Sequence, residues 1–369
     1  MNYNVYMPVR CIYGENAVIN SSALLASLGS KCLIVTGKHG AKKSGALDDA
    51  VKALQDEGIS FEIYDGITEN PLISSCHEAG KKARDFNADF ILGIGGGSAQ
   101  DASKAIAFFA TNPDFAPEDI YGKDNGCIPP IPVALIGTTA GTGSEVTAVS
   151  VLTNDKTGFK KSVKGPDCYA KISFCDPKYT YSLPYDYTVS TALDAFHHAI
   201  EGFFTDKCEG VERIYAEKAI PMLYSCLKEL SLTDTVDLSL REPLYYGSIY
   251  AGLVINTCGT AFPHPMGYVL TENYSVPHGT ACAAFFTDFI DRCKIYSPEK
   301  SEAFFKMTED ENEVKKVITS LVKLDGIKID PDLAHKYSAR WENVIPGNFT
   351  ASPGGLTREE AEKILLKFN

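Results

Sequence analysis

Residues 89–104 read DFILGIGGGSAQDASK, and this stretch decides the fold of the first half of the chain. An apolar run over 89–94 leads into Gly95-Gly96-Gly97 and Ser98. Short apolar runs bounded by glycine are typical of strands buried in a parallel sheet. Glycines let a pyrophosphate approach the backbone, and the N-terminus of a following helix attracts the anion. The stretch predicts a strand, a phosphate-binding loop and a helix; the alternative is a tight turn without a ligand.

Strands and helices alternate on both sides of this stretch. The apolar patterns predict further strands at 31–36, 61–64 and 131–136, and helices at 46–57, 73–86 and 99–110. A β-α-β-α order predicts a parallel, doubly wound sheet. Such sheets bind ligands at the carboxyl ends of their strands.

A second polar loop, GTTAGTGSE, occupies 137–145, directly after the strand expected at 131–136. Its hydroxyl and backbone amide groups suit a phosphate, a ribose or a carboxamide. The glycine stretch is only a near match to the dinucleotide fingerprint G-x-G-x-x-G, because Ser98 stands at its last position. Two such loops after neighbouring strands nevertheless favour a nucleotide site over two ordinary turns.

From about residue 183 onward the pattern is helical. We expect helices at 188–205, 211–230, 243–262, 280–291, 313–323 and 358–368. A chain of 369 residues is also too long for one compact core. The sequence therefore predicts an α/β domain over 1–182 and an all-helical domain over 183–369.

Four residues of the helical half suggest a metal site. Asp194 and His198 stand four apart on an expected helix, and residues at this spacing share one face. His264, between two prolines, and His278, before Gly279, are expected at helix ends. One carboxylate and three imidazoles suit ferrous iron or zinc. Each residue alone would more often be a hydrogen-bonding or capping group.

Composition excludes several classes of function. The chain has 35 Lys and Arg against 47 Asp and Glu, a net charge of −12, which disfavours a non-specific nucleic-acid binder. No apolar run approaches the ~20 residues of a membrane span. The start, MNYNVYMPVRCIYG, lacks the features of a signal peptide, and the 11 cysteines form no C-x-x-C pair. We expect a cytoplasmic protein with reduced thiols.

The motifs in this order resemble the iron-containing (group III) alcohol dehydrogenase family. They are G-G-G-S-x-x-D-x-x-K, T-T-A-G-T-G-S-E, D-A-x-x-H-A-I-E-G and H-x13-H-G, and the resemblance covers essentially the whole chain. It implies the dehydroquinate synthase-like fold, in which a Rossmann-like nucleotide domain precedes an all-helical metal domain. It also implies NAD or NADP and one Fe2+ or Zn2+ ion in the cleft between them.

The resemblance assigns roles to individual residues. The metal ligands fall on Asp194, His198, His264 and His278. The pyrophosphate loop falls on Gly95, Gly96, Gly97 and Ser98, with Asp101 nearby, and the second cofactor loop on Thr138, Thr139, Thr142 and Ser144. Lys160 resembles a lysine that approaches the cofactor ribose. Some relatives carry a histidine four residues after the third ligand; Tyr268 stands there and could relay a proton, as could a water.

The implied activity is that of an NAD(P)-linked alcohol dehydrogenase or aldehyde reductase acting on a small alcohol or aldehyde. Hydride would pass between a metal-bound alkoxide and C4 of the nicotinamide. Three alternatives stay open: a glycerol dehydrogenase-like polyol oxidoreductase, a metallohydrolase of a phosphorylated substrate, and a nucleotide-sensing module without turnover. The resemblance further implies a homodimer, which could pair through an edge strand around 4–9.

The residues after the first strand bear on the choice of cofactor. Many family members have an Asp there, which holds the ribose hydroxyls of NAD, whereas this chain has Gly37. A carboxylate would repel the 2′-phosphate of NADP by about 4 kcal/mol at 4 Å and an effective dielectric of 20. Cations and donors follow at Lys38, His39, Lys42, Lys43 and Ser44. The sequence predicts a preference for NADP; the alternative is a glycine turn beside solvated lysines.

Overall fold

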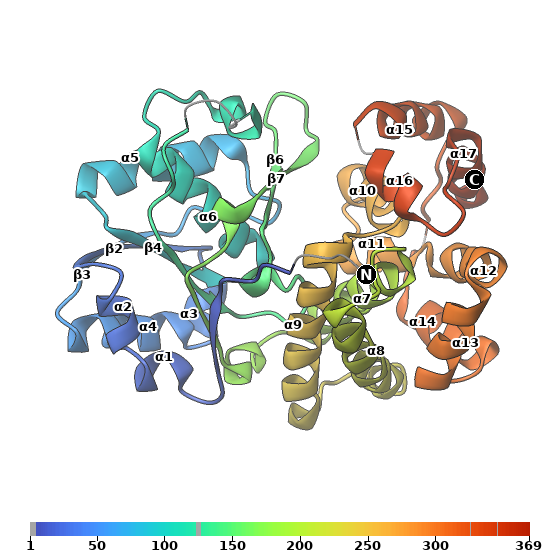
Figure 1. Cartoon of the computed structure of the whole chain (residues 1–369), viewed down its shortest axis with the longest axis horizontal. Helices are drawn as coiled ribbons and strands as arrows, with labels where there is room; N and C mark the ends of the chain where they lie inside the picture. Colours follow the sequence, from blue (N-terminus) through green and yellow to red (C-terminus); the bar gives the residue numbers. More distant parts are fainter. Residues whose placement is uncertain (1–4, 123–126, 325, 345) are drawn as a thin grey trace. The chain divides into compact units, whose positions relative to one another are not determined.

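The structure is a computed structural model that describes residues 5–122, 127–324, 326–344 and 346–369. The chain divides between Leu183 and Pro184 into two units. We call Tyr6–Leu183 the sheet unit and the part that contains Pro184–Asn369 the helical unit. In Figure 1 the sheet unit runs from blue to green and the helical unit from yellow-green to red.

A parallel sheet forms the centre of the sheet unit. Within the described residues it has the order β1-β8-β5-β4-β2-β3, and every neighbouring pair is parallel. Its strands are β1 (Arg10–Tyr13), β2 (Lys31–Thr36), β3 (Ser60–Tyr64), β4 (Phe90–Gly95), β5 (Val133–Gly137) and β8 (Ile172–Cys175). The order reverses between β2 and β4, the position at which doubly wound sheets bind nucleotides. In the sheet register, Gly95 of β4 pairs with Gly137 of β5. Both expected cofactor loops therefore begin at the carboxyl ends of neighbouring strands.

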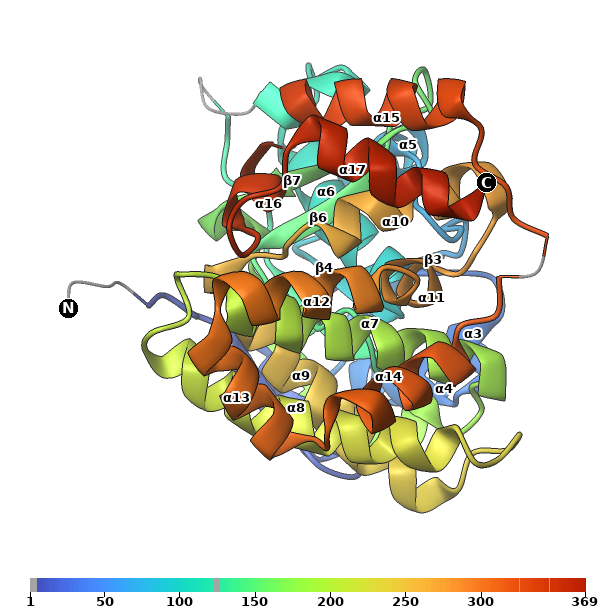
Figure 2. The ribbon, with the colours of Figure 1, turned by 90° about the vertical axis from the view of Figure 1, so that its right-hand side faces the viewer.

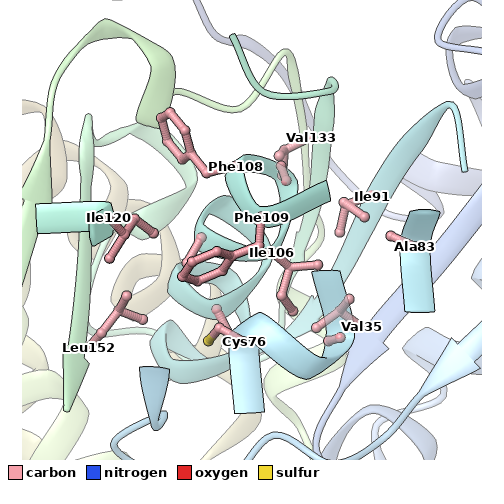
Figure 3. Packing of buried hydrophobic residues seen from close by; sticks show 14 of the residues in the cluster. Val35, Cys76, Ala83, Ile91, Ile106, Phe108, Phe109, Ile120, Val133 and Leu152 are labelled. Atoms are coloured by element: carbon pink, nitrogen blue, oxygen red, sulfur yellow. The ribbon is translucent and has the colours of Figure 1, made fainter. Parts of the chain in front are cut away.

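Alternating side chains of the strands enter two separate cores. Leu33 and Val35 of β2 pack under α5 (Ile73–Phe86) and α6 (Gly97–Thr111), as part of the cluster in Figure 3. Cys32 and Ile34 face the other way, toward α1 (Ala17–Asn20), α2 (Ala23–Ala26) and α4 (Ala46–Asp56). Because helices cover both faces of the sheet, the central strands β2, β4 and β5 are almost wholly apolar, which explains why 31–36 could be recognised as a buried strand.

Four strands of the sheet unit, β1, β8 and the two strands of one hairpin, were not predicted. The strands β1 and β8 are each only four residues long. The hairpin is antiparallel and consists of β6 (Val149–Thr153) and β7 (Lys160–Lys164), and it directly follows the second polar loop. The prediction of a strand around 4–9 is wrong for Val5–Val9, which do not form a strand. Asn4 lies outside the described residues. The edge strand is β1 instead, and it pairs with β8.

The helical unit is built around α7 (Tyr185–Phe204), which packs against α8, α9 and α11. Figure 2 views this unit from the side of α12, α13 and α14. Its other helices are α8 (Val211–Leu230), α9 (Arg241–Cys258), α10 (Pro263–Tyr274), α11 (His278–Ala283), α12 (Phe286–Tyr296), α13 (Pro298–Met307), α14 (Glu311–Leu321), α15 (Pro331–Val344), α16 (Pro346–Ala351) and α17 (Arg358–Leu365).

Two helix boundaries near the expected histidines differ from the prediction. The helix expected at 243–262 ends at Cys258, followed by Gly259 with φ of 72°. Pro263 does not break that helix but begins α10, since the first helical position needs no backbone N–H. The helix expected at 280–291 is two helices, α11 and α12. Both histidines still lie in the first turn of a helix, His264 in α10 and His278 in α11.

The packing of α5 on α6 yields a stability prediction. In an open helix, Gly→Ala stabilises a protein by up to about 1 kcal/mol. At Gly80, however, an added Cβ would lie 2.4 Å from Cβ of Phe109 and 3.0 Å from its carbonyl carbon. Gly80→Ala should therefore lower the free energy of unfolding by roughly 1–3 kcal/mol, because the helices must separate.

Gly40→Ala is the matched control, since Gly40 begins the short helix α3 (Gly40–Lys43) and a Cβ there meets nothing within 4 Å. Urea unfolding followed by circular dichroism measures both variants. A Gly80→Ala chain as stable as Gly40→Ala would contradict the close contact.

Candidate metal centre and cofactor loops

The long helix α7 carries the first two of the expected metal ligands. Asp194 and His198 are both almost buried, at 4% and 6% exposed. Oδ1 of Asp194 lies 3.7 Å from Nε2 of His198, so the four-residue spacing does bring the two side chains together. The pair is part of a buried helix face rather than of a solvated surface.

Two glycines let α10 and α11 approach closely. A Cβ at Gly279 would lie 1.8 Å from the carbonyl oxygen of Ser190 on α7, so only glycine permits α11 to rest on α7 there. A Cβ at Gly267 of α10 would lie 3.0 Å from the backbone nitrogen of Cys282 on α11. These contacts explain how His264 and His278, on short separate helices, reach the carboxylate of α7.

The structure brings both of these histidines to Asp194. Nε2 of His264 lies 3.5 Å and Nε2 of His278 lies 3.8 Å from the same oxygen, Oδ1 of Asp194. The rings of His198 and His264 are stacked, with centroids 4.6 Å apart. Cys282 joins the group, because one donor atom each of Asp194, His264, His278 and Cys282 lie within 4.8 Å of one another. The three expected histidine ligands therefore surround one carboxylate oxygen of the fourth expected ligand, Asp194.

Cys282 is the member of this cluster that the sequence analysis missed. It lies four residues after His278 on α11, and its Sγ is 3.8 Å from both ring nitrogens of that histidine. All 11 cysteines lie among the described residues, and none of them forms a disulfide there. The His-x-x-x-Cys spacing on a helix would have indicated it, just as the Asp-x-x-x-His spacing indicated the first pair.

The cluster fits a divalent ion. Oδ1 of Asp194 and Nε2 of His264 are buried and have no hydrogen-bond partner within the described part of the chain. Buried polar atoms are nearly always satisfied, and an orphaned pair requires an explanation such as an absent ion. A carboxylate oxygen with imidazole nitrogens is the donor set that iron and zinc use. These residues could hold such an ion.

The charges around the cluster shift several pKa values. Burial opposes the ionisation of Asp194, but the neighbouring imidazoles, His198 foremost, outweigh it and hold its pKa well below its usual range. Burial likewise opposes protonation of His264, but the carboxylates of Glu201 and Asp194 raise its pKa to about 10. A cation that binds here must displace a proton, so its affinity falls as the pH falls.

Tyr268 lies beside the cluster on α10. Its ring stacks on that of His278, with centroids 5.6 Å apart and an interplanar angle of 23°. Burial, with smaller contributions from nearby acidic groups, raises the pKa of its hydroxyl above the usual value. The group is therefore protonated at neutral pH.

The two polar loops of the sheet unit lie against each other. A Cβ at Gly96 would lie 2.9 Å from Cγ2 of Thr139, and one at Gly97 would lie 2.4 Å from Cγ2 of Thr142. The backbone nitrogen of Thr138 donates to the carbonyl oxygen of Gly95 at 3.0 Å. The close packing of the second loop therefore requires glycine at Gly96 and Gly97, whether or not a ligand binds there. No side chain caps the N-terminus of α6 at Gly96, which leaves this end of the helix suited to an anion.

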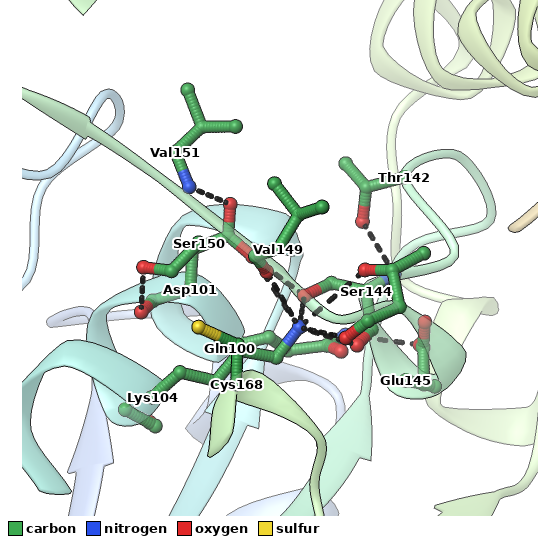
Figure 4. Close-up of polar contacts among 12 residues, drawn as sticks. Gln100, Asp101, Lys104, Thr142, Ser144, Glu145, Val149, Ser150, Val151 and Cys168 are labelled. Atoms are coloured by element: carbon green, nitrogen blue, oxygen red, sulfur yellow. Dashed lines mark hydrogen bonds and ion pairs between the residues drawn. The ribbon is translucent and has the colours of Figure 1, made fainter. Parts of the chain in front are cut away.

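Behind these loops lies a buried polar network centred on Lys104 (Figure 4). Its Nζ donates to Oγ and the carbonyl oxygen of Ser144, both at 2.8 Å, and to the carbonyl oxygens of Thr147 and Val149 at 3.0 and 2.8 Å. Ser144 Oγ in turn donates to Oδ1 of Asp101 at 2.6 Å. Burial lowers the pKa of Lys104 and raises that of Asp101, each against the charge of the other.

Asp101 and Ser144, two of the expected cofactor residues, therefore use their side chains in hydrogen bonds within the protein. Ser144 uses its hydroxyl between Lys104 and Asp101, and Oδ2 of Asp101 accepts from the backbone nitrogen of Val151 at 2.8 Å. Ser98 is half-buried, and its Oγ likewise accepts a bond within the protein, from the backbone nitrogen of Asn70 at 3.3 Å.

The remaining expected cofactor residues lie at the ends of two strands. Gly37 follows β2 directly, and Lys38 and Lys42 after it are exposed, as are His39 and Lys43. A Cβ at Gly37 would lie 3.0 Å from the carbonyl oxygen of Ile67, so there is little room for a side chain at this position. Lys160 is the first residue of β7, and it is only 8% exposed.

Comparison with known proteins identifies the family. The model of iron-containing alcohol dehydrogenase matches residues 8–177, and that of the C-terminal part of the Fe-containing alcohol dehydrogenase family matches 188–340. 1,3-Propanediol dehydrogenase of Citrobacter freundii is 31% identical over 309 residues, 81% of this chain and 78% of the relative. Sulfoacetaldehyde reductase of Bilophila wadsworthia is 32% identical over 300 residues, 80% and 76% of the two chains.

A more distant relative and a solved structure agree. Alcohol dehydrogenase 4 of Schizosaccharomyces pombe is 28% identical over 278 residues, which are 75% of this chain and 65% of the relative's own length. The crystal structure of an iron-containing alcohol dehydrogenase from Thermotoga maritima is 30% identical, has a TM-score of 0.91, and is matched over 99% of this chain and 100% of that chain. The chain therefore belongs to the iron-containing alcohol dehydrogenase family and is a metal-dependent, NAD(P)-linked alcohol dehydrogenase.

Proposed function

We propose that the chain interconverts a small primary alcohol and its aldehyde at a single divalent ion held by Asp194, His198, His264 and His278. The observation that carries this proposal is the orphaned pair of buried atoms, Oδ1 of Asp194 and Nε2 of His264. A divalent cation would satisfy both atoms and offset the buried carboxylate. When bound, it acts as a Lewis acid that lowers the pKa of the substrate alcohol.

Ferrous iron is the physiological metal that the family favours, and zinc is the alternative. Three imidazoles and one carboxylate suit both ions. The thiol of Cys282 adds a softer donor within the cluster, and thiolates favour zinc.

Residues beside the ion pass on the proton that the substrate hydroxyl gives up or takes back. The raised pKa of Tyr268 suits a hydrogen-bond donor or a relay that passes a proton on, rather than a tyrosinate base. Its stacking on His278 keeps the ring beside the ligand cluster. A water molecule could share this role.

In the sheet unit, Gly95, Gly96, Gly97 and Ser98 bind the pyrophosphate of the cofactor at the uncapped N-terminus of α6. Thr138, Thr139 and Thr142 supply polar groups from the second loop, and Lys160 approaches the ribose. We assign Asp101 and Ser144 an indirect role: together with Lys104 they fix the second loop against α6. In this assignment the nucleotide-binding domain spans 1–182 and the metal-binding domain spans 183–369.

The cofactor preference that we propose is NADP(H). Gly37 presents no carboxylate to repel a 2′-phosphate, and the exposed residues Lys38 and Lys42 follow it in the chain. The relatives include an NADH-dependent butanol dehydrogenase of Clostridium acetobutylicum and a sulfoacetaldehyde reductase solved with NAD+, so the proposal concerns a departure particular to this chain.

The names of the relatives support a short substrate with a terminal hydroxyl or aldehyde group. They include dehydrogenases of 1,3-propanediol, butanol and methanol. The propanediol enzymes favour one second candidate, a polyol oxidoreductase of the glycerol dehydrogenase kind. A panel of short alcohols and diols, assayed with each cofactor and each metal, separates the two.

We further propose a cytoplasmic homodimer. The exposed edge of the sheet at β1 needs cover, and pairing with a second copy would provide it. Of the helices that the structure describes, none has both the length and the apolar character to cross a bilayer. Light scattering over a wide concentration range tests the dimer, and a constant monomer mass would contradict it.

Removing one ligand tests the metal centre. His278→Ala should weaken metal binding by more than about 100-fold, since even indirect ligand supports cost 10–100-fold, and turnover should be lost. Binding of the nicotinamide nucleotide should be unchanged, because the glycine loop shares no residue with the cluster. Chelator competition measures the metal affinity, and quenching of the reduced cofactor's fluorescence measures the nucleotide affinity.

His335→Ala is the matched control, because that side chain is 66% exposed and lies outside the cluster. Full activity of His278→Ala after thorough chelation and reloading would exclude this site as the catalytic one.

The cofactor preference is tested at Lys42. Lys42→Ala should reduce kcat/KM for NADPH by about tenfold, or ~1.4 kcal/mol, and leave that for NADH unchanged, because only NADPH carries the 2′-phosphate. Steady-state kinetics with both cofactors provide the measurement. Gly37→Asp is a less clean test, since the new Cβ would press on the carbonyl of Ile67.

Lys52→Ala serves as the control, as an exposed lysine on α4 that forms an ion pair with Asp56. A wild type that favours NADH by tenfold or more would show that Gly37 and its lysines form no phosphate site.

A further inference from the structure

Glu201 is a fully buried carboxylate on α7, three residues beyond His198, and it is not among the expected ligands. Its Oε1 accepts from Nδ1 of His264 at 2.8 Å and from Nδ1 of His197 at 3.0 Å. Its Oε2 accepts from the backbone nitrogen of Ala261 at 2.8 Å. Burying a carboxylate is costly unless it is hydrogen-bonded, and here three donors converge on it.

The donors determine how the ring of His264 must carry its proton. A carboxylate only accepts hydrogen bonds, so the nitrogen of His264 that faces Glu201 must be protonated. When a cation displaces its second proton, the neutral imidazole keeps one N–H at Nδ1, which leaves the lone pair of His264 on Nε2. Nε2 is the atom that lies 3.5 Å from Oδ1 of Asp194 and has no hydrogen-bond partner in the described chain.

His197 and Ala261 hold the carboxylate in place. His197 lies on the same helix as His198 but faces away from the cluster, and its side chain is fully buried. Its hydrogen bond and that of His264 both end on Oε1 of Glu201. The bond from Ala261 anchors the turn just before α10, the helix that begins at Pro263 and presents His264.

We propose that Glu201 is a positioning residue for the metal centre, which fixes the Nδ1-protonated tautomer and the orientation of His264 so that Nε2 faces the ion. The inference rests on the proposed metal site at Asp194, His198, His264 and His278. Carboxylate–histidine–metal arrangements of this kind tune ligands in other metalloproteins, and their loss weakens metal binding by 10–100-fold.

Glu201→Gln is the direct test, because an amide replaces one acceptor with a donor at nearly constant volume. In one orientation its NH2 group faces the N–H of Ala261; in the other it faces the two histidine N–H groups. The second orientation forces the proton of His264 onto Nε2, the ligand atom. The dissociation constant for Zn2+, measured by chelator competition on the full chain without substrate, should rise about 10–100-fold.

A conservative variant and a control separate positioning from general destabilisation. Glu201→Asp keeps the charge and should restore part of the Zn2+ affinity. Glu212→Gln alters another almost fully buried glutamate, on α8, and should leave the Zn2+ affinity unchanged. Nucleotide affinity should be the same in all three variants, since none of them alters the sheet unit.

The outcomes are distinct. A wild-type chain that binds no Zn2+ would overturn the proposed metal site itself. A wild type that binds Zn2+, with Glu201→Gln and Glu201→Asp both binding it within twofold as tightly, would overturn the role of Glu201. If Glu201→Gln does not fold, the test rests on Glu201→Asp, whose shorter side chain cannot keep all three hydrogen bonds. A Glu201→Asp chain that binds Zn2+ as tightly as the wild type would contradict the inference.

Discussion

The burial of Asp194 is the constraint on which the helical unit depends. An ionised carboxylate away from water is costly unless opposite charge and hydrogen bonds surround it. Three imidazoles from α7, α10 and α11 provide part of this compensation, and they reach Oδ1 only because Gly267 and Gly279 let the helices approach closely. The orphaned Oδ1 leaves a place for a cation. In the sheet unit Lys104 is also a buried charge, but loop carbonyls and Ser144 satisfy it internally, so it fixes a loop instead of binding a ligand.

Much of the fold could be predicted from the sequence, where one physical signal dominated. The strand at 31–36 and the helix at 73–86 match β2 and α5 in full, because one is an uninterrupted apolar run and the other is amphipathic and free of proline. The short strands β1 and β8 were missed because four residues are too few for a pattern to emerge. Pro263 was misinterpreted because proline can either end a helix or begin one, and only the tertiary structure decides.

The clustering of the four proposed ligands was predictable for a similar reason: helical spacing put Asp194 and His198 on one face, and the motif order supplied His264 and His278. What the sequence could not reveal was the use made of the neighbouring polar groups. Asp101 and Ser144 were interpreted as cofactor contacts, but they bond to each other. Glu201 drew no attention, because a glutamate on a helix is usually solvated, and only the fold shows three donors directed at its carboxylate.

Anomalous X-ray diffraction at the iron absorption edge, from crystals of the chain loaded with Fe2+ without oxygen, tests the central claim most directly. The account predicts one strong peak, about 2.0–2.2 Å from the ligating oxygen of Asp194 and nitrogens of His198, His264 and His278. The electron-density map of the same crystals would place Nδ1 of His264 against Glu201, with Nε2 toward the peak. Iron bound elsewhere, or an empty cluster in crystals that contain the ion, would contradict the account.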